Sequence, residues 1–429
     1  MNLATLAAEA AARHCPVRVG LIGAGKFGSM FLSQVPTIAG IEVTAIAELD
    51  HARMVAACTA VGWDTARIDA LSYEESGAEL AKRDDVDVVI EATGNPRAGT
   101  EHALAAIEAG KHVVMVNVEA DVMVGPLLAQ KARAEGVCYS MAYGDQPALV
   151  SEMVDWARAT GFDITAAGKG TKYLPIYHTV TPDNVWDYYG LSADQARAAG
   201  MNPQMFNSFL DGTKSAIEMV AIANACSLDV PTSGLSFPPC GVDDLAHVLR
   251  PKEFGGQLEK RGMVETISSL ERDGRDVFRD LRWGVYVVFE APNDYAESCF
   301  KQYGLPTDRT GQFAAMYKPF HLIGLELSIS VLSVALRNEP TGQSHEIRGT
   351  VASIAKRDLS AGEVLDGEGG YTVWGQALPL NVAQNALPIG LAHGVRLKRN
   401  ISLGSQIKLS DVDLGNDTAT KMYLELFAS

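Results

Sequence analysis

Lys214 and Glu218 combine residue types and a spacing that could move protons to and from a substrate. Side chains at positions i and i+4 of a helix project from one face, so both groups could reach the same substrate atom. A lysine tuned by burial or by a neighbouring charge can protonate a carbonyl oxygen or deprotonate a hydroxyl group. The alternative interpretation is a surface ion pair, which would stabilise its helix by only about 0.2–0.5 kcal/mol.

Further lysines lie in segments that we expect to line the same cleft. Lys169 and Lys172 are additional candidates for the proton transfer, whereas Lys318, His321 and Asp145 are candidates for binding the substrate. Several lysines together could hold a phosphate or carboxylate group through charge-assisted hydrogen bonds. Solvation at the start of a helix is the alternative interpretation for Lys318 and His321.

Acidic residues could also supply oxygen ligands for Mg²⁺ or Mn²⁺. Glu119, Asp121 and Asp145 are the candidates, but their spacing matches no specific metal motif. A divalent metal is therefore a candidate cofactor whose ligands the sequence leaves unassigned. The six scattered cysteines include no CxxC pair and no close group with histidine, so we expect neither a zinc site nor a disulfide framework.

A glycine motif at residues 23–28 indicates a dinucleotide site. Gly23, Gly25 and Gly28 form GxGxxG between the strand-like run VRVGLI and a helical run that includes Lys26 and Phe27. The first glycine permits a tight turn, the second lets the backbone approach a pyrophosphate, and the third lets the helix pack on the strand. The N–H groups at the start of the helix would then face the phosphates.

Polar residues at the ends of the following strands extend the expected cofactor site. Glu48 follows the second strand, where an acidic side chain accepts hydrogen bonds from the ribose hydroxyls of NAD, while Arg53 could contact the 2′-phosphate of NADP. Both coenzymes therefore stay open. The other candidates follow the next two strands, at the edge where open α/β sheets bind ligands, and are Thr93, Gly94, Asn117 and Glu119.

Alternating strands and helices must position these residues. The runs VRVGLIG, IEVTAIAELD, DVDVVIEATG and KHVVMVNVEA read as strands, separated by helical segments such as EHALAAIEAG and VGPLLAQKARAEG. Such alternation predicts an α/β fold with a doubly wound parallel sheet of the Rossmann type over residues 1–151, preceded by a short amphipathic helix.

An α+β substrate and oligomerisation domain is expected over residues 152–340. FDITAAGK and RWGVYVVFEAP predict strands, and FAAMYKPFHLIGLELSISVLSVAL predicts one long helix that could return to cover the nucleotide domain. The polar segment RNEPTGQS, residues 337–344, is the expected linker. Beyond it, short strand-like runs broken by glycine and aspartate predict a small all-β domain over residues 345–429.

The overall composition excludes several other classes of protein. The chain has 429 residues, of which 47% are hydrophobic and 21% charged, so it is neither a long disordered chain nor a fibrous repeat. Its net charge of −16 disfavours binding to nucleic acid or to an anionic membrane. The N-terminus lacks the features of a signal peptide, and no run reaches the roughly 18 apolar residues of a membrane span. We expect a cytoplasmic protein whose partner is a small-molecule substrate.

The segments VRVGLIGAGKFG, VIEATG and KHVVMVNVEA resemble the nucleotide domain of the homoserine dehydrogenase superfamily. KGTKY, at residues 169–173, resembles the family's substrate-domain signature, with lysines in place of two asparagines. The run from Gly212 to Glu218 resembles a later helix of the family, with acid and base in swapped order. The segments AKRDLSAGEVL and LPIGLAHGVRLKRNISLGSQIKLSDVDL look like a SAF-type β-clip domain.

The combination of GDQPALV, DGTKSAIEMV and YKPFHLIGLE is similar to 1-deoxy-D-xylulose 5-phosphate reductoisomerase-like proteins. That resemblance implies NADPH, a divalent metal, and the isomerisation and reduction of a phosphorylated ketose in isoprenoid precursor synthesis. The alternatives are homoserine-type oxidation of an amino or hydroxy acid, and a non-catalytic nucleotide sensor. We expect an NAD(P)-dependent oxidoreductase that acts on the CH–OH group of a small anionic compound and assembles as a homodimer or homotetramer.

Overall fold

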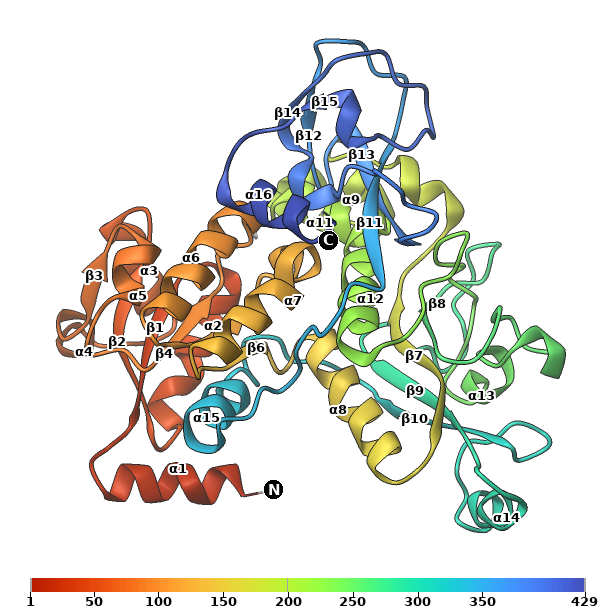
Figure 1. The fold of residues 1–429 in the computed structure, drawn as a ribbon, viewed down its shortest axis with the longest axis horizontal. Coiled ribbons are helices and arrows are strands. Elements are labelled where there is room, and N and C mark those ends of the chain that lie inside the picture. The colour runs from red at the N-terminus through yellow and green to blue at the C-terminus, as the bar shows by residue number, and fades with distance from the viewer. Residues whose placement is uncertain (1, 199, 428–429) are drawn as a thin grey trace. The chain divides into compact units, whose positions relative to one another are not determined.

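The computed structural model describes residues 2–198 and 200–427, which divide into two compact units (Figure 1). Unit 1 comprises Met1–Glu152, His321–His345 and Asp417–Ser429, and unit 2 comprises Met153–Phe320 and Glu346–Asn416. Each unit is therefore assembled from separate stretches of chain. The residues outside the description, which include the outermost positions of the expected first and last segments, are Met1, Ala199, Ala428 and Ser429.

Unit 1 contains a six-stranded sheet in the order β3-β2-β1-β4-β5-β6, in which every neighbouring pair is parallel. This is the strand order of a doubly wound dinucleotide-binding fold, so the prediction of a Rossmann sheet is confirmed. Two short edge strands, β3 and β6, add to the four expected ones. The strands are β1 Val17–Ile22, β2 Ile41–Ala47, β3 Ser72–Glu74, β4 Val88–Glu91, β5 His112–Met115 and β6 Tyr139–Met141.

Helices connect these strands, and several begin at polar residues whose side chains accept hydrogen bonds from the first turn. Asp50, Asn95 and Asn117 cap α3, α6 and α7 in this way. The helical elements of this part of the chain are α1 Leu3–Ala12, α2 Lys26–Gln34, η1 Val35–Thr37, α3 His51–Ala60, α4 Thr65–Asp69, α5 Gly77–Ala81, α6 Pro96–Glu108, α7 Val118–Ala134 and α8 Gln146–Ala159. The later stretches of unit 1 add α15 Ser328–Arg337 and α16 Thr418–Glu425.

The single long helix expected over residues 313–336 is wrong. Its first part is strand β10, Phe313–Lys318, and a helix forms only over α15. Pro319 disfavours helical backbone at the residue before it, and the strand ends at Lys318 because proline has no backbone N–H to donate. Gly324 then adopts a φ of +78°, a left-handed conformation that a continuous helix excludes.

Helix α15 nevertheless returns to the nucleotide-binding sheet, as expected. Leu327, Val331 and Val334 are almost completely buried in the hydrophobic core of unit 1, together with side chains of β1 and β4. Figure 1 shows α15 beside α1, and the two helices are in contact. The core of unit 1 is therefore completed by residues far from it in sequence.

Unit 2 contains a four-stranded mixed sheet in the order β10-β9-β7-β8. Strand β8 is parallel to β7, and β9 is antiparallel to both β7 and β10. Two smaller antiparallel sheets, β11-β13 and β12-β14-β15, form from the later stretch, so a β-rich tail is observed. The strands are β7 Asp163–Thr171, β8 Met263–Ser268, β9 Val285–Glu290, β10, β11 Gly349–Ala355, β12 Val364–Asp366, β13 Val373–Pro379, β14 His393–Leu397 and β15 Val412–Asp413.

Helix α12, Thr213–Cys226, runs through the centre of unit 2. It packs against β7 and β8 of the mixed sheet and against β11 and β13 of the tail, so that all its residues except Lys214 and Ala225 are buried. The remaining helical elements of unit 2 are η2 Pro175–Thr179, α9 Val185–Tyr189, α10 Ala193–Ala198, α11 Pro203–Leu210, α13 Leu245–Val248, η3 Lys252–Phe254, α14 Asp294–Gln302, η4 Ile389–Leu391 and η5 Leu409–Asp411.

The expected domain segments follow the chain continuously, whereas the two units do not. The expected segment 152–340 contributes to both units, because the chain re-enters unit 1 at His321. The expected segment 345–429 is also shared, since its residues up to Asn416 belong to unit 2 and α16 belongs to unit 1. All six cysteines are free thiols. Among the described residues, no helix combines the length and apolar character that crossing a membrane requires.

Candidate functional site

The loop between β1 and α2 contains three glycines under three different constraints. Gly23 has a φ of +91°, and a Cβ there would lie 2.9 Å from the carbonyl oxygen of Ala92. A Cβ at Gly28 would lie 2.4 Å from the carbonyl oxygen of Gly23, so only glycine lets α2 pack this closely. A Cβ at Gly25, in contrast, would meet no atom of the described residues within 4 Å. The fold explains Gly23 and Gly28, while the open space at Gly25 suits the approach of a ligand to the backbone.

The start of α2 adds N–H groups to this open space. Gly25 is the N-cap residue and has no side chain to bind the N–H groups of the first turn. Lys26, the first residue of the helix, is exposed, and Phe27 is half-buried against the core. Because free N–H groups at a helix N-terminus attract phosphate, the loop fits the pyrophosphate of a dinucleotide.

Glu48 follows β2, as expected, and its carboxylate accepts a backbone hydrogen bond from the glycine loop. The side chain is only 8% exposed. Its Oε2 accepts a hydrogen bond from the N–H of Ala24 at 3.0 Å, and its Oε1 accepts one from the N–H of Leu49 at 3.0 Å. Arg53 Nη1 lies 3.6 Å from the same Oε1, with the arginine side chain 62% exposed. Both residues expected to distinguish NAD from NADP therefore lie together beside the loop.

Glu91, which the sequence analysis did not single out, organises the loop after β4. Its side chain is completely buried, and its Oε1 accepts a hydrogen bond from the hydroxyl of Thr93 at 2.5 Å. His102 Nδ1 lies 3.3 Å from the same oxygen, whereas Oε2 has no hydrogen-bond partner among the described residues. An unpaired buried carboxylate oxygen is costly, and a water or a ligand hydroxyl would satisfy it. The acidic end of the apolar strand VVIE is the signal that points to this residue.

Asn117 joins the loops that follow β4 and β5. Its Oδ1 accepts a hydrogen bond from the N–H of Ala120 at 3.1 Å, and its Nδ2 donates one to the carbonyl oxygen of Asn95 at 2.9 Å. Gly94, beside Asn95, has a φ of +69° and is exposed, and Glu119 is half-buried in the first turn of α7. In this structure Asn117 thus positions the backbone of both loops.

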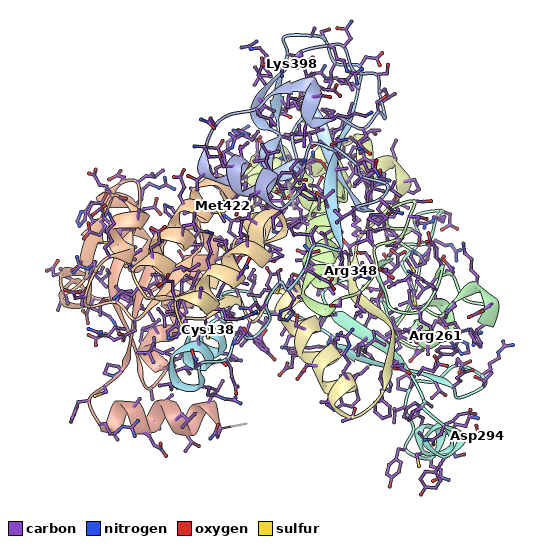
Figure 2. All side chains as sticks on the ribbon, in the orientation of Figure 1. Cys138, Arg261, Asp294, Arg348, Lys398 and Met422 are labelled. Atoms are coloured by element: carbon purple, nitrogen blue, oxygen red, sulfur yellow. The ribbon has the colours of Figure 1, made fainter. Side chains whose placement is uncertain are left out.

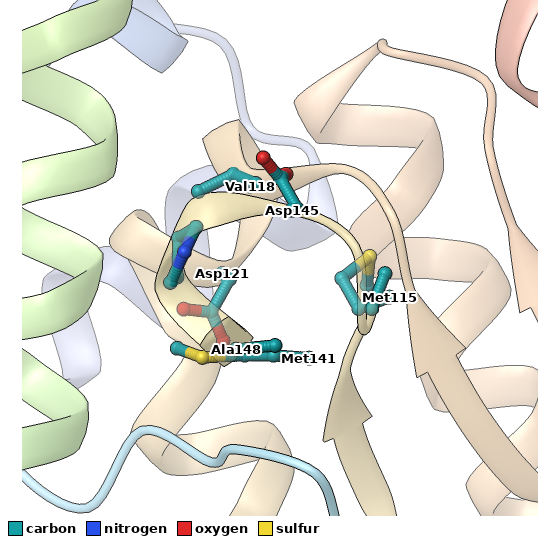
Figure 3. Close-up of a pocket in the computed structure, with 8 residues that line it drawn as sticks. Met115, Val118, Asp121, Met141, Asp145 and Ala148 are labelled. Atoms are coloured by element: carbon teal, nitrogen blue, oxygen red, sulfur yellow. The ribbon is translucent and has the colours of Figure 1, made fainter. Parts of the chain in front are cut away.

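A small cavity of ≈ 10 Å³ lies at the ends of β5 and β6 (Figure 3). Met115 and Met141, the last residues of these strands, line it together with Asp121 and Asp145. Asp145 is 3% exposed, and its Oδ1 accepts a hydrogen bond from the N–H of Gln146 at 2.9 Å. Because a cavity of this volume holds about one water molecule, it is too small for a substrate.

Asp121 is held in this cavity wall by two hydroxyl groups. Tyr139 donates a hydrogen bond to its Oδ1 at 3.0 Å, and Ser344 donates one to its Oδ2 at 2.8 Å. Burial raises the pKa of Asp121 to about 6, although both hydrogen bonds favour the charged form. Asp121 is therefore a buried carboxyl group that neutral hydroxyls stabilise.

The acidic candidates do not form a metal site in this arrangement. Within the described part of the chain, no group of three or more His, Cys, Asp or Glu side chains could hold a metal ion. Glu119, Asp121 and Asp145 thus supply no such group, and both oxygens of Asp121 already accept hydrogen bonds. The donor set does not fit a resident metal ion.

Lys318 and His321 belong to different units. His321 lies in unit 1, with its Nε2 3.2 Å from Nε2 of Gln146, the neighbour of Asp145. Lys318 ends β10 in unit 2, and its Nζ lies 5.8 Å from the ring centre of Phe320. Neither residue starts a helix, so their interpretation as solvated groups at a helix N-terminus is wrong.

Lys169 and Glu218 form a buried ion pair between β7 and α12. Their side chains are 8% and 3% exposed. Among the described residues Lys169 has no other hydrogen-bond or ion-pair partner, although an ammonium group carries three donors. The buried hydroxyls of Ser215, one turn before Glu218, and Thr266, opposite Lys169 on β8, also lack hydrogen-bond partners in the described structure. Such unsatisfied polar groups are typical of functional sites.

Glu218, one turn after Lys214, is turned toward β7 and pairs with Lys169, a partner that the sequence analysis did not predict. Lys214 is half-buried in the first turn of α12, one turn before Glu218. The spacing of the two residues on one helix is as predicted, but the partner comes from a strand. Lys169, Lys214 and Glu218 therefore lie in the same unit, on two elements that pack together.

Lys172 lies just after β7 and is part of a cationic and aromatic group. Its Nζ donates a hydrogen bond to the carbonyl oxygen of Tyr188 and lies 5.9 Å from the ring centre of Tyr189. Burial lowers the pKa of Lys172, and the nearby charge of Arg282 lowers it further. A lysine in this state releases its proton more readily than an exposed one.

A second buried ion pair, Lys356 with Asp211, was not expected from the sequence. Lys356 Nζ lies 2.8 Å from Asp211 Oδ2, and the two side chains are 2% and 0% exposed. Asp211 precedes α12, and Lys356 follows β11 of the tail. Nothing in the composition of either segment signals that the two residues meet.

Two family models match this chain. Residues 17–116 match the oxidoreductase family with an NAD-binding Rossmann fold (GFO/IDH/MocA), and residues 144–327 match the catalytic domain of oxidoreductase DRL. The first match contains the glycine loop, and the second contains Lys169, Lys214 and Glu218. Neither of these two matches extends into the β-rich tail.

Individual proteins are similar over parts of the chain. 1-Deoxy-D-xylulose 5-phosphate reductoisomerase of Acinetobacter baumannii is 42% identical over 66 residues, which cover 15% of this chain and 16% of the relative's length. A homoserine dehydrogenase from Thiobacillus denitrificans is 19% identical, with 49% of each chain covered and a TM-score of 0.37. A probable dehydrogenase from Thermotoga maritima is 14% identical, with 76% of this chain and 90% of that chain covered and a TM-score of 0.39.

The Rossmann sheet, the ligand-accessible glycine loop and the two family matches lead to one assignment. The nucleotide-binding residues lie in the first match, and the buried lysine–glutamate pair lies in the second. The comparisons therefore support an NAD(P)-dependent oxidoreductase in which residues 17–116 are similar to the GFO/IDH/MocA Rossmann fold and residues 144–327 are similar to the DRL catalytic domain.

Proposed function

We propose that this protein is an NADPH-dependent reductase of a small phosphorylated ketose, of the 1-deoxy-D-xylulose 5-phosphate reductoisomerase type. The match to the DRL catalytic domain and the 42% identical segment shared with the Acinetobacter baumannii reductoisomerase support this choice of substrate. The chain spans 16% of that relative's length, so the substrate is a proposal and not a consequence of the match.

The observation that carries the proposal is the buried pair of Lys169 and Glu218. Glu218 fixes the position of Lys169, while the uncommitted N–H donors of Lys169 can bind and protonate a substrate oxygen. Lys214, one turn away on α12, is the second candidate for this proton transfer. A bound nicotinamide dinucleotide would supply the hydride to the same carbonyl group.

The phosphate group of such a substrate requires local positive charge in a chain whose net charge is −16. Lys172 and Lys318, both in unit 2, are the proposed contacts. Ammonium groups bind phosphate strongly when both are partly removed from water, as the half-buried Lys172 and Lys318 would allow.

The choice of coenzyme depends in this proposal on Glu48 and Arg53. Glu48 would accept hydrogen bonds from ribose hydroxyls and repel a 2′-phosphate, whereas Arg53 could swing toward that phosphate because its side chain is exposed. The ratio of NADPH to NADH affinity in the wild-type protein and in an Arg53→Ala variant tests this point. Equal effects of the substitution on both affinities would argue against a phosphate contact by Arg53.

The activity itself is tested by following the absorbance of the reduced nicotinamide with 1-deoxy-D-xylulose 5-phosphate, with and without Mg²⁺ or Mn²⁺. We expect oxidation of NADPH that depends on the ketose. In Lys214→Met we expect the rate to fall by about 10²–10⁴-fold if the lysine takes part in proton transfer. A variant that keeps more than about a tenth of the wild-type turnover would return Lys214 to an ordinary helix position.

The alternative function, oxidation of an amino or hydroxy acid of the homoserine type, is favoured by one observation. The motif-like segment at residues 169–173 ends β7 next to α12, and it contains Lys169 and Lys172. Homoserine with NAD⁺ or NADP⁺ in the same assay distinguishes the two functions. A protein that binds the dinucleotide but turns over neither substrate would favour the nucleotide sensor instead.

A further inference from the structure

We propose that the tail strands β11 and β13, with Lys356 just after β11, position the start of the catalytic helix α12. Lys356, Trp374 and Gly375 hold the residues that immediately precede or begin α12, one to three residues from Lys214. These three are positioning residues, since they would act on the substrate only through α12. The inference rests on the proposed function, which places Lys214 and Glu218 at the reaction.

Lys356 connects the tail to the α11–α12 junction through an ion pair and two hydrogen bonds. Besides its ion pair with Asp211, its Nζ donates hydrogen bonds to the carbonyl oxygens of Val180 at 2.8 Å and Gly370 at 2.9 Å. Two donors of the ammonium group are thus used in hydrogen bonds, the charge faces Asp211 Oδ2, and the side chain is 2% exposed. These contacts hold the Lys356 side chain against Asp211 and against two backbone carbonyl groups.

Asp211 connects Lys356 to Thr213, the first residue of α12. Its Oδ1 accepts a hydrogen bond from the N–H of Thr213 at 2.9 Å, while its Oδ2 faces Lys356. The hydroxyl of Thr213 in turn accepts a hydrogen bond from the N–H of Gly375 on β13, at 2.8 Å. The tail therefore contacts the start of α12 both through a charge and through a backbone hydrogen bond.

Gly212, between Asp211 and Thr213, fits against a layer of aromatic rings. It has a φ of +92°, and a Cβ there would lie 3.2 Å from the ring of His178. The ring of Trp374 from β13 stacks on His178 with 3.9 Å between ring centres. His178 Nδ1 lies 2.7 Å from the carbonyl oxygen of Asp211, and burial lowers the pKa of this histidine. A neutral His178 donates to Asp211 and packs between Gly212 and Trp374.

The Nε2 atom of His178 connects these aromatic rings to Tyr173. Since Nδ1 carries the proton, Nε2 accepts a hydrogen bond from the hydroxyl of Tyr173 at 2.9 Å. Tyr173 stacks on Phe237 with 4.0 Å between ring centres. Tyr173 belongs to the segment that follows β7, two residues after the strand ends and four after Lys169. The elements that carry Lys169 and Lys214 are thus linked through His178 to Trp374 of the tail.

These contacts differ from simple packing because they act at one end of α12. The first turn of a helix moves as a unit, so a shift of Thr213 moves Lys214 by a similar amount. A displacement of about 1 Å at a catalytic group can cost about 10²-fold in rate. Loss of the tail contacts should therefore lower turnover more than it lowers the binding of the dinucleotide, which the glycine loop of unit 1 provides.

The test compares Lys356→Met with Lys398→Met in the full-length protein. Lys398, labelled in Figure 2, also lies in the tail, but its side chain is 51% exposed and pairs with Asp413 at 3.4 Å. We expect Lys356→Met to lower kcat for 1-deoxy-D-xylulose 5-phosphate by about 10²-fold per folded molecule, with NADPH affinity unchanged. Hydrogen exchange of the peptide covering residues 211–220 should become faster. Lys398→Met should change each value less than about twofold.

A folded Lys356→Met protein with wild-type kcat and unchanged exchange at residues 211–220 would overturn the proposal. If Lys356→Met does not fold, Thr213→Val decides, because it removes only the hydroxyl that accepts from Gly375. We then expect a several-fold lower kcat at unchanged NADPH affinity, and wild-type kcat in this variant contradicts the proposal.

A wild-type protein that does not turn over the ketose at all would refute the proposed function separately. In that case the exchange experiment alone decides whether the tail holds α12. Faster exchange at residues 211–220 in Lys356→Met, but not in Lys398→Met, supports the positioning role, and equal exchange in both refutes it.

Discussion

Two buried lysine–carboxylate pairs contact α12, and they differ in how completely they are satisfied. Besides its ion pair with Asp211, Lys356 donates hydrogen bonds to two carbonyl oxygens, and Oδ1 of Asp211 accepts one from the backbone of Thr213. Lys169 has Glu218 as its partner in the described structure and keeps donors uncommitted. Burial and charge are similar in both pairs, so these properties alone do not distinguish a structural pair from a reactive one.

The difference has a simple physical origin. Removing two charges from water costs free energy, which their mutual attraction and additional hydrogen bonds must offset. The pair of Lys356 recovers this cost within the protein. The pair of Lys169 does not, and the buried hydroxyls of Ser215 and Thr266 nearby are also unsatisfied in the described structure. A substrate oxygen that binds there would complete the set, which makes spare hydrogen-bonding capacity the better sign of function.

The largest loss of stability should follow from removing the tail, which contains Lys356 of the Lys356–Asp211 pair. In a chain that ends at Ser344, Asp211 would remain buried without its cation, at a cost of about 3–5 kcal/mol, and α12 would lose the strands β11 and β13. Since a whole protein is stable by only about 5–15 kcal/mol, we expect unit 2 to be unfolded in this fragment. Circular dichroism and thermal melting provide the measurement. A soluble fragment with a cooperative melt like that of the full chain would show that the tail is a separable domain, as its sequence suggests.

Turnover should depend most on the pair of Lys169 and Glu218, in which Lys169 keeps donors uncommitted. Glu218→Gln keeps the shape of the side chain but removes the charge opposite Lys169, and we expect turnover to fall by about 10²–10⁴-fold. The melting temperature should fall in both Glu218→Gln and Lys356→Met, because each substitution leaves a buried charge without its partner, and the larger loss of turnover should distinguish Glu218→Gln. Steady-state rates and melting curves of both variants check the contrast. The comparison fails if Glu218→Gln loses stability and not activity.

Gly25→Val tests the binding of the cofactor independently of the two buried ion pairs. A branched side chain would fill the open space at Gly25, so we expect no measurable binding of NADPH or NADH, while the fold and both ion pairs stay intact. Fluorescence titration with the reduced dinucleotide measures the affinity, and Gly62→Ala, a left-handed glycine in an open turn away from the loop, controls for general effects on the backbone. Unchanged affinity in Gly25→Val would contradict the assignment of the glycine loop.

The smallest expected effect is a change of stability with pH that depends on Asp121. This buried carboxyl group is held by hydroxyl groups and not by a cation. Its pKa of about 6 lies above the ordinary 3.8, so the native protein binds the proton more tightly than the unfolded chain. Stability should therefore fall as the pH rises from about 4 to about 6, and Asp121→Asn should lack this fall. At neutral pH the variant should be more stable by at most about 3 kcal/mol. Urea unfolding at several pH values measures the slope, and parallel slopes in both proteins would refute the prediction.

Local sequence patterns predicted much of unit 1. The strands β1, β2, β4 and β5 and the glycine loop follow from apolar runs of four to seven residues and from glycine spacing, which are properties of adjacent residues. The helix expected over residues 313–336 was wrong because apolar residues fit a buried strand as well as a helix. Pro319 and Gly324 were the local signals that could have divided it.

The partners of buried charges could not be predicted in the same way. Helix spacing correctly placed Lys214 and Glu218 on α12, but the buried face of that helix selects Lys169 as the partner of Glu218. Lys356 and Asp211 meet only because the tail folds against α12. The roles of Lys169, Lys172, Lys214 and Glu218 remain predictions that the assays above would test.

The discontinuous course of the chain has a consequence for how the protein is made. Residues Leu327, Val331 and Val334 complete the core of unit 1, and α16, which packs on α6 and α7, follows all of unit 2 in the sequence. On the ribosome, the nascent nucleotide-binding sheet must wait, with part of its apolar surface uncovered, until nearly all of unit 2 has emerged. Domains usually fold in the order of their synthesis, whereas here the first unit to begin is also the last to finish.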